Sequence, residues 1–245
     1  MTRKALIVYC DNTESGKLPG PSADNQNLRT HLTSPLGGDW YDSEIISLNN
    51  PTKLQVLQSI RTIGVADYSF VVFSGHGYIN TADNHKQYVE LSDGDLSISN
   101  LVSNSKRQTI IIDACRGYYS PTTQMFSKGL SGTFENFSGR QSTRKLFDHH
   151  LNNCEEGLSV MYAASKNQSA SDSDKGGAYL FSILKVCEIW AQNDSKKQKF
   201  SIRDAHNSGI IYMNKNFETK QKPTMHAEKR MRYFPLAVKW TQING

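Results

Sequence analysis

Short apolar runs alternate with amphipathic segments along most of the chain. The apolar runs are rich in Val, Ile, Leu and aromatic residues, as is typical of buried strands, and they span 5–9, 43–48, 68–74, 107–114 and 158–165. Helical spacing of apolar positions predicts helices over 22–32, 52–63, 177–192 and 202–216. A further apolar run at 232–240 could supply a last strand. Uniformly apolar strands that alternate with helices predict an α/β fold, in which helices cover both faces of a mostly parallel sheet.

The start of each of the first two helices can be predicted from capping residues. Ser22 is the expected N-cap of the first helix, and Thr52, which follows Pro51, suits the start of the second. The apolar face of the second helix is expected to hold Leu54, Leu57, Ile60 and Ile63.

Two segments interrupt the alternation of strands and helices. Residues 88–98 carry an Asp-Gly turn signal between two short extended pieces, which predicts a hairpin outside the main sheet. Residues 117–156 form a long polar stretch rich in Gly, Ser, Thr and Asn. A loop of this length in a compact domain is usually functional or disordered.

The composition is that of a globular protein. With 245 residues, 37% hydrophobic and 21% charged, the chain can bury a substantial core. No apolar run approaches the eighteen residues of a membrane span, and the N-terminal apolar run is expected to be a strand and not a signal peptide. The net charge of +5 comes from scattered basic residues, so neither nucleic acid nor a membrane is an expected partner.

The four cysteines have no spacing typical of a metal site. Cys10, Cys115, Cys154 and Cys187 form no CxxC pair and no zinc-ligand pattern with histidines, so no metal site and no cofactor are expected. Without an export signal we expect a cytoplasmic, reducing compartment and free thiols, with Cys187 in a helix core.

Two strands end in residues that can carry chemistry. Gly75-His76-Gly77 follows one apolar run, and Asp113-Ala114-Cys115 follows the next. Ligand sites of parallel sheets lie beyond the carboxyl ends of the strands, so His76 and Cys115 are expected to meet. A thiol needs a nearby base or imidazolium, which lowers its pKa, to act as a nucleophile. Flanking glycines leave amides available to stabilise an oxyanion.

The motifs "SGHG" and "DACRG" resemble those of the caspase, metacaspase and paracaspase superfamily of cysteine peptidases. Its caspase signature is Q-A-C-[RQG]-G with an upstream histidine, about 50 residues away in caspases and 39 residues away here. The resemblance extends from residue 5 to about residue 216. It implies a caspase-like fold with a six-stranded sheet, Cys115 as nucleophile, His76 as general base, and the amides of Gly77 and Cys115 as oxyanion donors. Similar short stand-alone proteins occur in prokaryotes.

Three acids depart from the pattern of caspases that cleave after aspartate. Those enzymes have Gln where this chain has Asp113, and an arginine where Asp172 stands, ten residues after Tyr162. "SKNQSASD" looks like a metacaspase stretch, and Asp24 matches an acidic position of metacaspases and paracaspases at the start of their first helix. Clustered carboxylates attract a cation, so we expect Asp24, Asp113 and Asp172 to select Arg, then Lys, before the scissile bond. Simpler structural roles are a first-turn helix acid for Asp24 and a loop cap for Asp172.

Calcium binding is a weaker alternative for the acidic residues. The only candidate clusters are Asp93 with Asp95 and Asp172 with Asp174, and neither has EF-hand spacing.

The resemblance also gives the long polar stretch a role. We expect a single caspase-like domain over 1–245, with a large-subunit-like part over 1–117, a linker over 117–156 and a small-subunit-like part over 157–245. Caspase-like enzymes are cut in this linker, and an Arg- or Lys-specific enzyme could cleave itself there. The candidate autocleavage sites are Lys128, Arg140, Arg144 and Lys145.

The sequence therefore predicts a latent cysteine endopeptidase that acts on protein or peptide substrates and is activated by a partner protein or a protease. The alternative is a catalytically silent caspase-like binding module. Intact His76 and Cys115 argue against this alternative.

Overall fold

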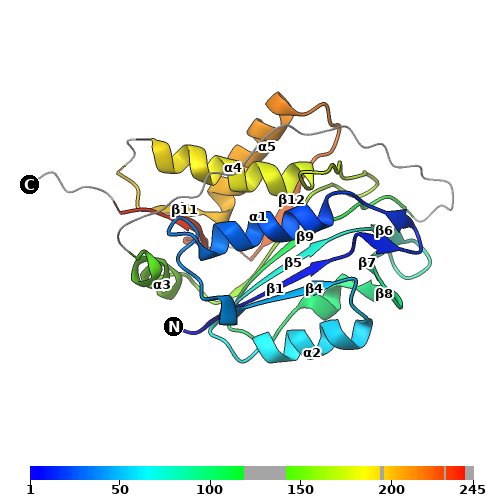
Figure 1. Ribbon diagram of the computed structural model, residues 1–245, viewed down its shortest axis with the longest axis horizontal. Helices are drawn as coiled ribbons and strands as arrows, with labels where there is room; N and C mark the ends of the chain where they lie inside the picture. Colours follow the sequence, from blue (N-terminus) through cyan, green and yellow to red (C-terminus); the bar gives the residue numbers. More distant parts are fainter. Residues whose placement is uncertain (119–141, 194–195, 229, 241–245) are drawn as a thin grey trace, which may run out of the picture.

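A six-stranded sheet forms the centre of the molecule, with the strand order β12-β10-β9-β5-β1-β4 (Figure 1). The computed structural model describes residues 1–118, 142–193, 196–228 and 230–240. All neighbouring strands are parallel except β12, which pairs antiparallel with β10 at one edge. The strands span Arg3–Tyr9 (β1), Ile45–Asn49 (β4), Tyr68–Ser74 (β5), Arg107–Asp113 (β9), Gly157–Tyr162 (β10) and Thr224–Ala227 (β12). The prediction of a mostly parallel sheet in an α/β fold is confirmed.

Helices cover both faces of this sheet, as predicted. Figure 1 shows α2 on one face and α1, α4 and α5 on the other. The helices span Pro21–Thr33 (α1), Lys53–Ile63 (α2), Arg144–Asn152 (α3), Ala178–Gln192 (α4) and Ile202–Asn216 (α5).

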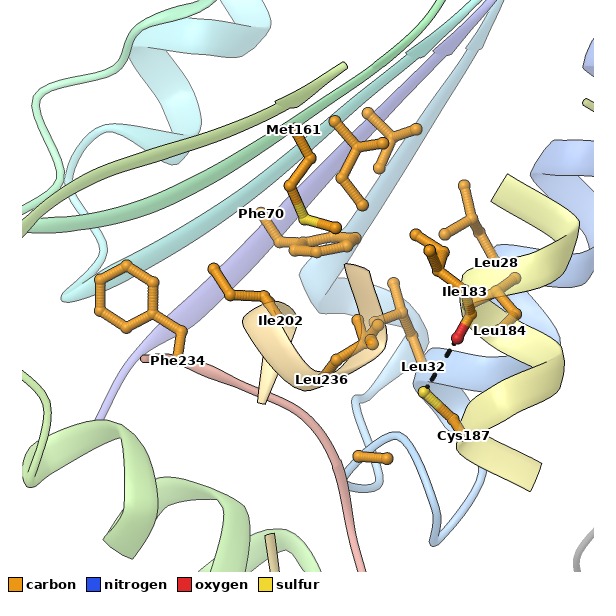
Figure 2. Close-up of a cluster of buried hydrophobic side chains, with 14 of the residues drawn as sticks. Leu28, Leu32, Phe70, Met161, Ile183, Leu184, Cys187, Ile202, Phe234 and Leu236 are labelled. Carbon is orange, nitrogen blue, oxygen red and sulfur yellow. Dashed lines mark hydrogen bonds between the residues drawn. The ribbon is translucent and has the colours of Figure 1, made fainter. Parts of the chain in front are cut away.

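Alternate side chains of the buried strand β5 supply two separate hydrophobic cores. Phe70 and Val72 pack with the residues of α1 and α4, whereas Val71 and Phe73 pack with those of α2. Figure 2 shows the first core, in which Phe70 and Met161 of the sheet face Leu28 of α1 and helix α4. Every residue of β5 is buried, which explains the apolar run at its centre.

The capping predictions have different outcomes for the two helices. Thr52 caps α2 in a capping box, because its side chain accepts the Gln55 N–H while the Gln55 side chain binds the Thr52 N–H. The N-cap of α1 is Gly20 and not Ser22, because Pro21 already occupies the first helical position. The predicted apolar face of α2 is wrong for Leu54, which is 63% exposed; Val56 lies in the core instead.

The last strand of the main sheet is not the one that the sequence suggests. The apolar run at 232–240 forms β13 (Pro235–Val238), which pairs with β11 (Lys199–Ser201) in a separate two-stranded sheet. The edge strand β12 has the sequence TMHA and only partly buried or exposed residues. A short polar strand at a sheet edge has no apolar run by which it could be predicted.

The predicted hairpin outside the main sheet is confirmed. Strands β7 (Lys86–Leu91) and β8 (Gly94–Ser97) form it, and β6 (Gly77–Asn80) adds a third strand. Strand β6 begins directly after His76, so the small sheet continues from the end of β5.

The polar stretch 117–156 is not a loop throughout, because α3 lies within it. Arg144 is therefore not in an open loop: its guanidinium forms a two-pronged ion pair with Glu44 and lies 4.0 Å from the Tyr41 ring centroid. Lys145 follows it in the first turn of the helix. A protease cannot bind this backbone in extended form without unwinding α3, which makes Arg144 and Lys145 poor cleavage sites. Lys128 and Arg140 lie outside the described residues.

None of the helices within the described ranges is both long and apolar enough to cross a membrane.

Candidate active site

The two segments that follow β5 and β9 lie side by side. Ser74 pairs with Asp113 in the parallel register, and beyond this pair the Gly75 N–H donates to the Asp113 carbonyl at 3.2 Å. Further along, the Ile79 N–H donates to the Gly117 carbonyl at 2.8 Å. These two bonds bracket His76 on one segment and Cys115 on the other, so the topology brings the two predicted residues to the same edge of the sheet.

Gly77 allows this close approach because it has no side chain. A Cβ atom at Gly77 would lie 3.0 Å from the Ala114 Cβ and 3.2 Å from the Cys115 carbonyl oxygen. The Glu90 N–H donates to the His76 carbonyl, which makes these two residues a hydrogen-bonded pair of the β6–β7 ladder. Peptide groups alternate in direction along a strand, so the Gly77 N–H faces away from β7, toward the side on which the Ile79 N–H meets Gly117. Cys115 lies on that side.

The imidazole of His76 is fixed by a backbone carbonyl. Its Nε2 lies 3.2 Å from the carbonyl oxygen of Gly16, and the side chain is buried, with 8% exposed. A carbonyl oxygen can only accept a hydrogen bond, so Nε2 carries the proton and Nδ1 keeps its lone pair in the neutral ring. Burial lowers the pKa of His76, and the nearby Glu90 partly opposes this shift. The neutral ring is therefore the favoured resting form.

The thiol of Cys115 also rests in its neutral form. Its Sγ accepts a hydrogen bond from the Ala170 N–H at 3.3 Å, which favours the thiolate, but burial outweighs this and raises the pKa of Cys115. The expectation of a thiol pKa lowered by a neighbouring imidazolium is thus not met. Both pKa shifts favour a neutral thiol and a neutral imidazole, a pair in which the proton moves only during attack.

Cys115 and all three predicted acids line one cavity. The cavity has a volume of about 20 Å³, and Cys115, Asp24, Asp113 and Asp172 contribute to its wall. They come from segments far apart in the chain: the first turn of α1, the end of β9, and the loop between β10 and α4.

Two helix N-termini hold these carboxylates in place. In α4, the N–H of the N-cap Gly177 donates to Asp24 and that of Leu180 to Asp113, each at 3.0 Å. The N–H of Gly20, the N-cap of α1, donates to Asp172 at 3.1 Å. Anions are favoured at helix N-termini, where N–H groups are unpaired and the helix dipole is positive.

Burial dominates the electrostatics of the cluster. It raises the pKa of Asp113 to about 7 and that of Asp172 to about 6. Burial and the charge of Asp113 raise the pKa of Asp24 well above its usual value, although the Ser74 hydroxyl donates to it at 2.6 Å. The cluster therefore holds protons more tightly than exposed carboxylates do, and a bound cation would favour the charged forms.

Comparison with known protein families decides the identity of the fold. The caspase domain family matches residues 2–235. The chain belongs to the caspase-domain family. This is a family of cysteine peptidases.

Solved structures agree with this assignment of the fold. The crystal structure of caspase-1 from Spodoptera frugiperda is similar with a TM-score of 0.64 at 12% sequence identity. The similarity covers 99% of this chain and 91% of the insect chain. No curated protein sequence shows a significant match.

The acidic residues that the structure describes in this caspase-domain protein form no metal site. Within the described ranges, no group of three or more His, Cys, Asp or Glu side chains is arranged to hold a metal ion. Two of the candidate calcium acids have protein partners: Asp93 accepts the Lys53 N–H and Asp95 accepts the Tyr78 hydroxyl.

Three glycines around the acids could not be recognised from the sequence. A Cβ at Gly20 would lie 1.7 Å from Asp172, one at Gly176 2.2 Å from Asp24, and one at Gly177 2.5 Å from Asp113. Each carboxylate therefore occupies the space of a missing side chain. In the sequence, the pair Gly176-Gly177 before a helix indicates only a loop. The need for glycine there cannot be recognised, because Asp24 and Asp113, which fill the space of the missing side chains, are far away in the sequence.

Proposed function

We propose that this protein is a cysteine endopeptidase that hydrolyses peptide bonds after Arg and, less well, after Lys. The observation that carries the proposal is the shared cavity of Cys115 with Asp24, Asp113 and Asp172. A substrate whose carbonyl carbon lies at the thiol would direct the preceding side chain toward the acids.

The reaction uses the neutral thiol and imidazole described above. Nδ1 of His76 accepts the thiol proton while Sγ of Cys115 attacks the carbonyl carbon. The N–H groups of Gly77 and Cys115 stabilise the oxyanion. His76 then passes the proton to the leaving amine, which departs as the thioester forms. A water molecule deprotonated by His76 attacks the thioester, the C–S bond breaks, and the departing Cys115 sulfur takes the proton back from His76.

Specificity for Arg follows from the charge of the pocket and requires the pocket to widen. A volume of about 20 Å³ holds one or two water molecules, so a guanidinium has to displace the walls. The bond between the Gly20 N–H and Asp172 crosses from α1 to the loop before α4, and its release would open the cavity on that side. Arg is favoured over Lys because its planar fork can bind two carboxylates at once.

A panel of fluorogenic peptides with Arg, Lys, Asp or Leu before the scissile bond tests the proposal. We expect cleavage after Arg, slower cleavage after Lys and none after Asp, with no effect of calcium. Cleavage after Asp would overturn the acidic pocket but not the Cys–His pair. Strict calcium dependence would contradict the absence of a cofactor.

We further propose that the enzyme is latent until the segment before α3 is cut, at Lys128 or Arg140. Cleavage after Arg140 would give fragments of 140 and 105 residues, and cleavage after Lys128 fragments of 128 and 117 residues. SDS–PAGE should show these bands in the wild type and only the intact chain in an Arg140→Gln, Lys128→Gln double variant. Cleavage of the double variant at Arg144 would contradict the protective role of α3. Cleavage that persists in Cys115→Ala would assign the cut to another protease, which could be the activating partner.

The raised thiol pKa and the small cavity favour one second function, a silent caspase-like binding module. An activity-based thiol probe separates the two functions. A peptidase is labelled at Cys115, before or after cleavage of the linker, and a silent module is not.

A further inference from the structure

We propose that Glu90 is a positioning residue, which clamps the β2–β3 hairpin so that the Gly16 carbonyl holds the His76 imidazole. The hairpin strands span Asn12–Thr13 (β2) and Gly16–Lys17 (β3). The catalytic meaning of this clamp rests on the proposed function, whereas the clamp itself does not.

The Glu90 carboxylate holds the hairpin through both of its oxygens. The Thr13 hydroxyl donates to Oε2 at 2.7 Å, and the Ser15 hydroxyl donates to Oε1 in a short hydrogen bond. The Ser15 N–H approaches Oε2 at 3.4 Å. Thr13 precedes the turn that leads to Gly16, and Ser15 lies in it. Hydrogen bonds to a carboxylate are roughly twice as strong as those between neutral groups.

The backbone of Glu90 holds the other partner. Its N–H donates to the carbonyl of His76 at 3.1 Å, at the point where β6 and β7 begin to pair. One residue therefore binds both sides of the contact between His76 Nε2 and the Gly16 carbonyl: the histidine through its main chain and the hairpin through its side chain.

The hairpin needs such an anchor. Its strands have two residues each, and an isolated two-stranded hairpin is marginally stable at best. It also leads through Leu18 and Pro21, which line the acidic cavity, into α1. If the hairpin loosened, the Gly16 carbonyl would no longer hold the proton on Nε2 of His76, and the wall of the acidic cavity would shift.

The tautomer of His76 is the direct readout. The chain has seven histidines, and the signal of His76 can be assigned in ¹⁵N-detected imidazole spectra by its absence from His76→Gln. We expect the Nε2–H tautomer in the wild type and a mixture of tautomers in Glu90→Ala. Glu90→Gln loses the charge, but its oxygen can still accept the Thr13 hydroxyl and its amide can donate to the Ser15 hydroxyl oxygen, so it should keep the wild-type tautomer. Glu14→Ala, which removes an exposed carboxylate of the same turn, is the matched control.

Kinetics give the second readout. Glu90→Ala should lower kcat for the Arg peptide by about 10- to 100-fold with little change in KM, because a base displaced by about 1 Å loses rate. Glu90→Gln and Glu14→Ala should stay within about threefold of the wild type. Thr13→Val combined with Ser15→Ala removes the two hydroxyl donors on the hairpin side. This double variant should show the same loss of kcat, and it provides the test if Glu90→Ala does not fold.

The outcomes separate this inference from the proposed function. A wild-type tautomer and wild-type kcat in a folded Glu90→Ala or in the double variant would overturn the clamp. Loss of kcat in Glu90→Gln equal to that in Glu90→Ala would show that charge, and not geometry, is what Glu90 supplies. If the wild type cleaves no peptide, the proposed function fails, but the tautomer still decides whether the clamp exists.

Discussion

Replacement of Cys115 by Ala should lower kcat/KM for a peptide with Arg before the scissile bond by about 10⁴-fold or more. Loss of a nucleophile from a comparable triad costs about 10⁶-fold in kcat, and only binding and oxyanion stabilisation remain. Steady-state kinetics measure this effect. Cys187→Ala is the control, because this thiol is buried in α4, where it donates to the Ile183 carbonyl (Figure 2). Equal losses in both variants would point to damage of the fold and contradict a special role of Cys115.

Because Cys115 and His76 both rest in their neutral forms, the reactivity of the Cys115 thiol should depend on pH. Burial raises the pKa of Cys115, so the thiolate fraction and the rate of alkylation by iodoacetamide should continue to rise above about pH 8. A rate that reaches its plateau below pH 7 would show a preformed thiolate and contradict this geometry of the pair.

Replacement of Asp113 by Asn should lower kcat/KM for the Arg peptide by about 10²-fold or more and make the protein more stable at pH 8. Removal of one charge from a desolvated ion pair costs about 2–5 kcal/mol. The Asn side chain can still accept the Leu180 N–H, so the pocket keeps its shape. For a peptide with Leu before the scissile bond, kcat/KM should therefore be the same in Asp113→Asn as in the wild type. Asp174→Asn is the matched control, since Asp174 is exposed on the loop between β10 and α4 that also carries Asp172.

The gain in stability follows from the raised carboxylate pKa. Asp113 has a pKa of about 7 in the fold and near 3.8 when unfolded, so the folded state binds more protons between these values. The free energy of unfolding therefore falls as the pH rises from about 4 to about 7. Asn does not ionise, and we expect a gain of up to about 4 kcal/mol at pH 8 and little at pH 4. Thermal unfolding of both proteins at the two pH values measures it, and a variant less stable than the wild type at pH 8 would contradict the electrostatic account.

Local patterns predict most of the elements of this fold. Helix α5 has the bounds that apolar spacing predicts, and a capping box of Ser201 and Asp204 starts it. The strands β5 and β9 are buried almost throughout, and the apolar runs at their centres identify them. Strand β12 and helix α3 were missed, because β12 has no apolar run and α3 lies within a polar stretch whose docking depends on Glu44, about 100 residues away.

The candidate site was predictable only where a motif carries it. His76, Cys115 and the three acids stand in recognisable stretches. The groups that hold them do not: Gly16, Gly20, Ala170 and Glu90 act through backbone atoms or through contacts between distant segments. Such contacts leave no local pattern. The direction of the thiol pKa was likewise out of reach, because it depends on burial in the folded chain.

The central claim is that a thiol and an acidic pocket act together on a cationic substrate. Its most direct test compares two peptides that differ only in Arg or citrulline before the scissile bond, because citrulline has nearly the shape of Arg and no charge. We expect kcat/KM for the citrulline peptide to be lower by about 10³-fold, with both activities lost in Cys115→Ala. Equal cleavage of the two peptides by the wild type would contradict the acidic pocket, and cleavage of the Arg peptide by Cys115→Ala would contradict the nucleophile.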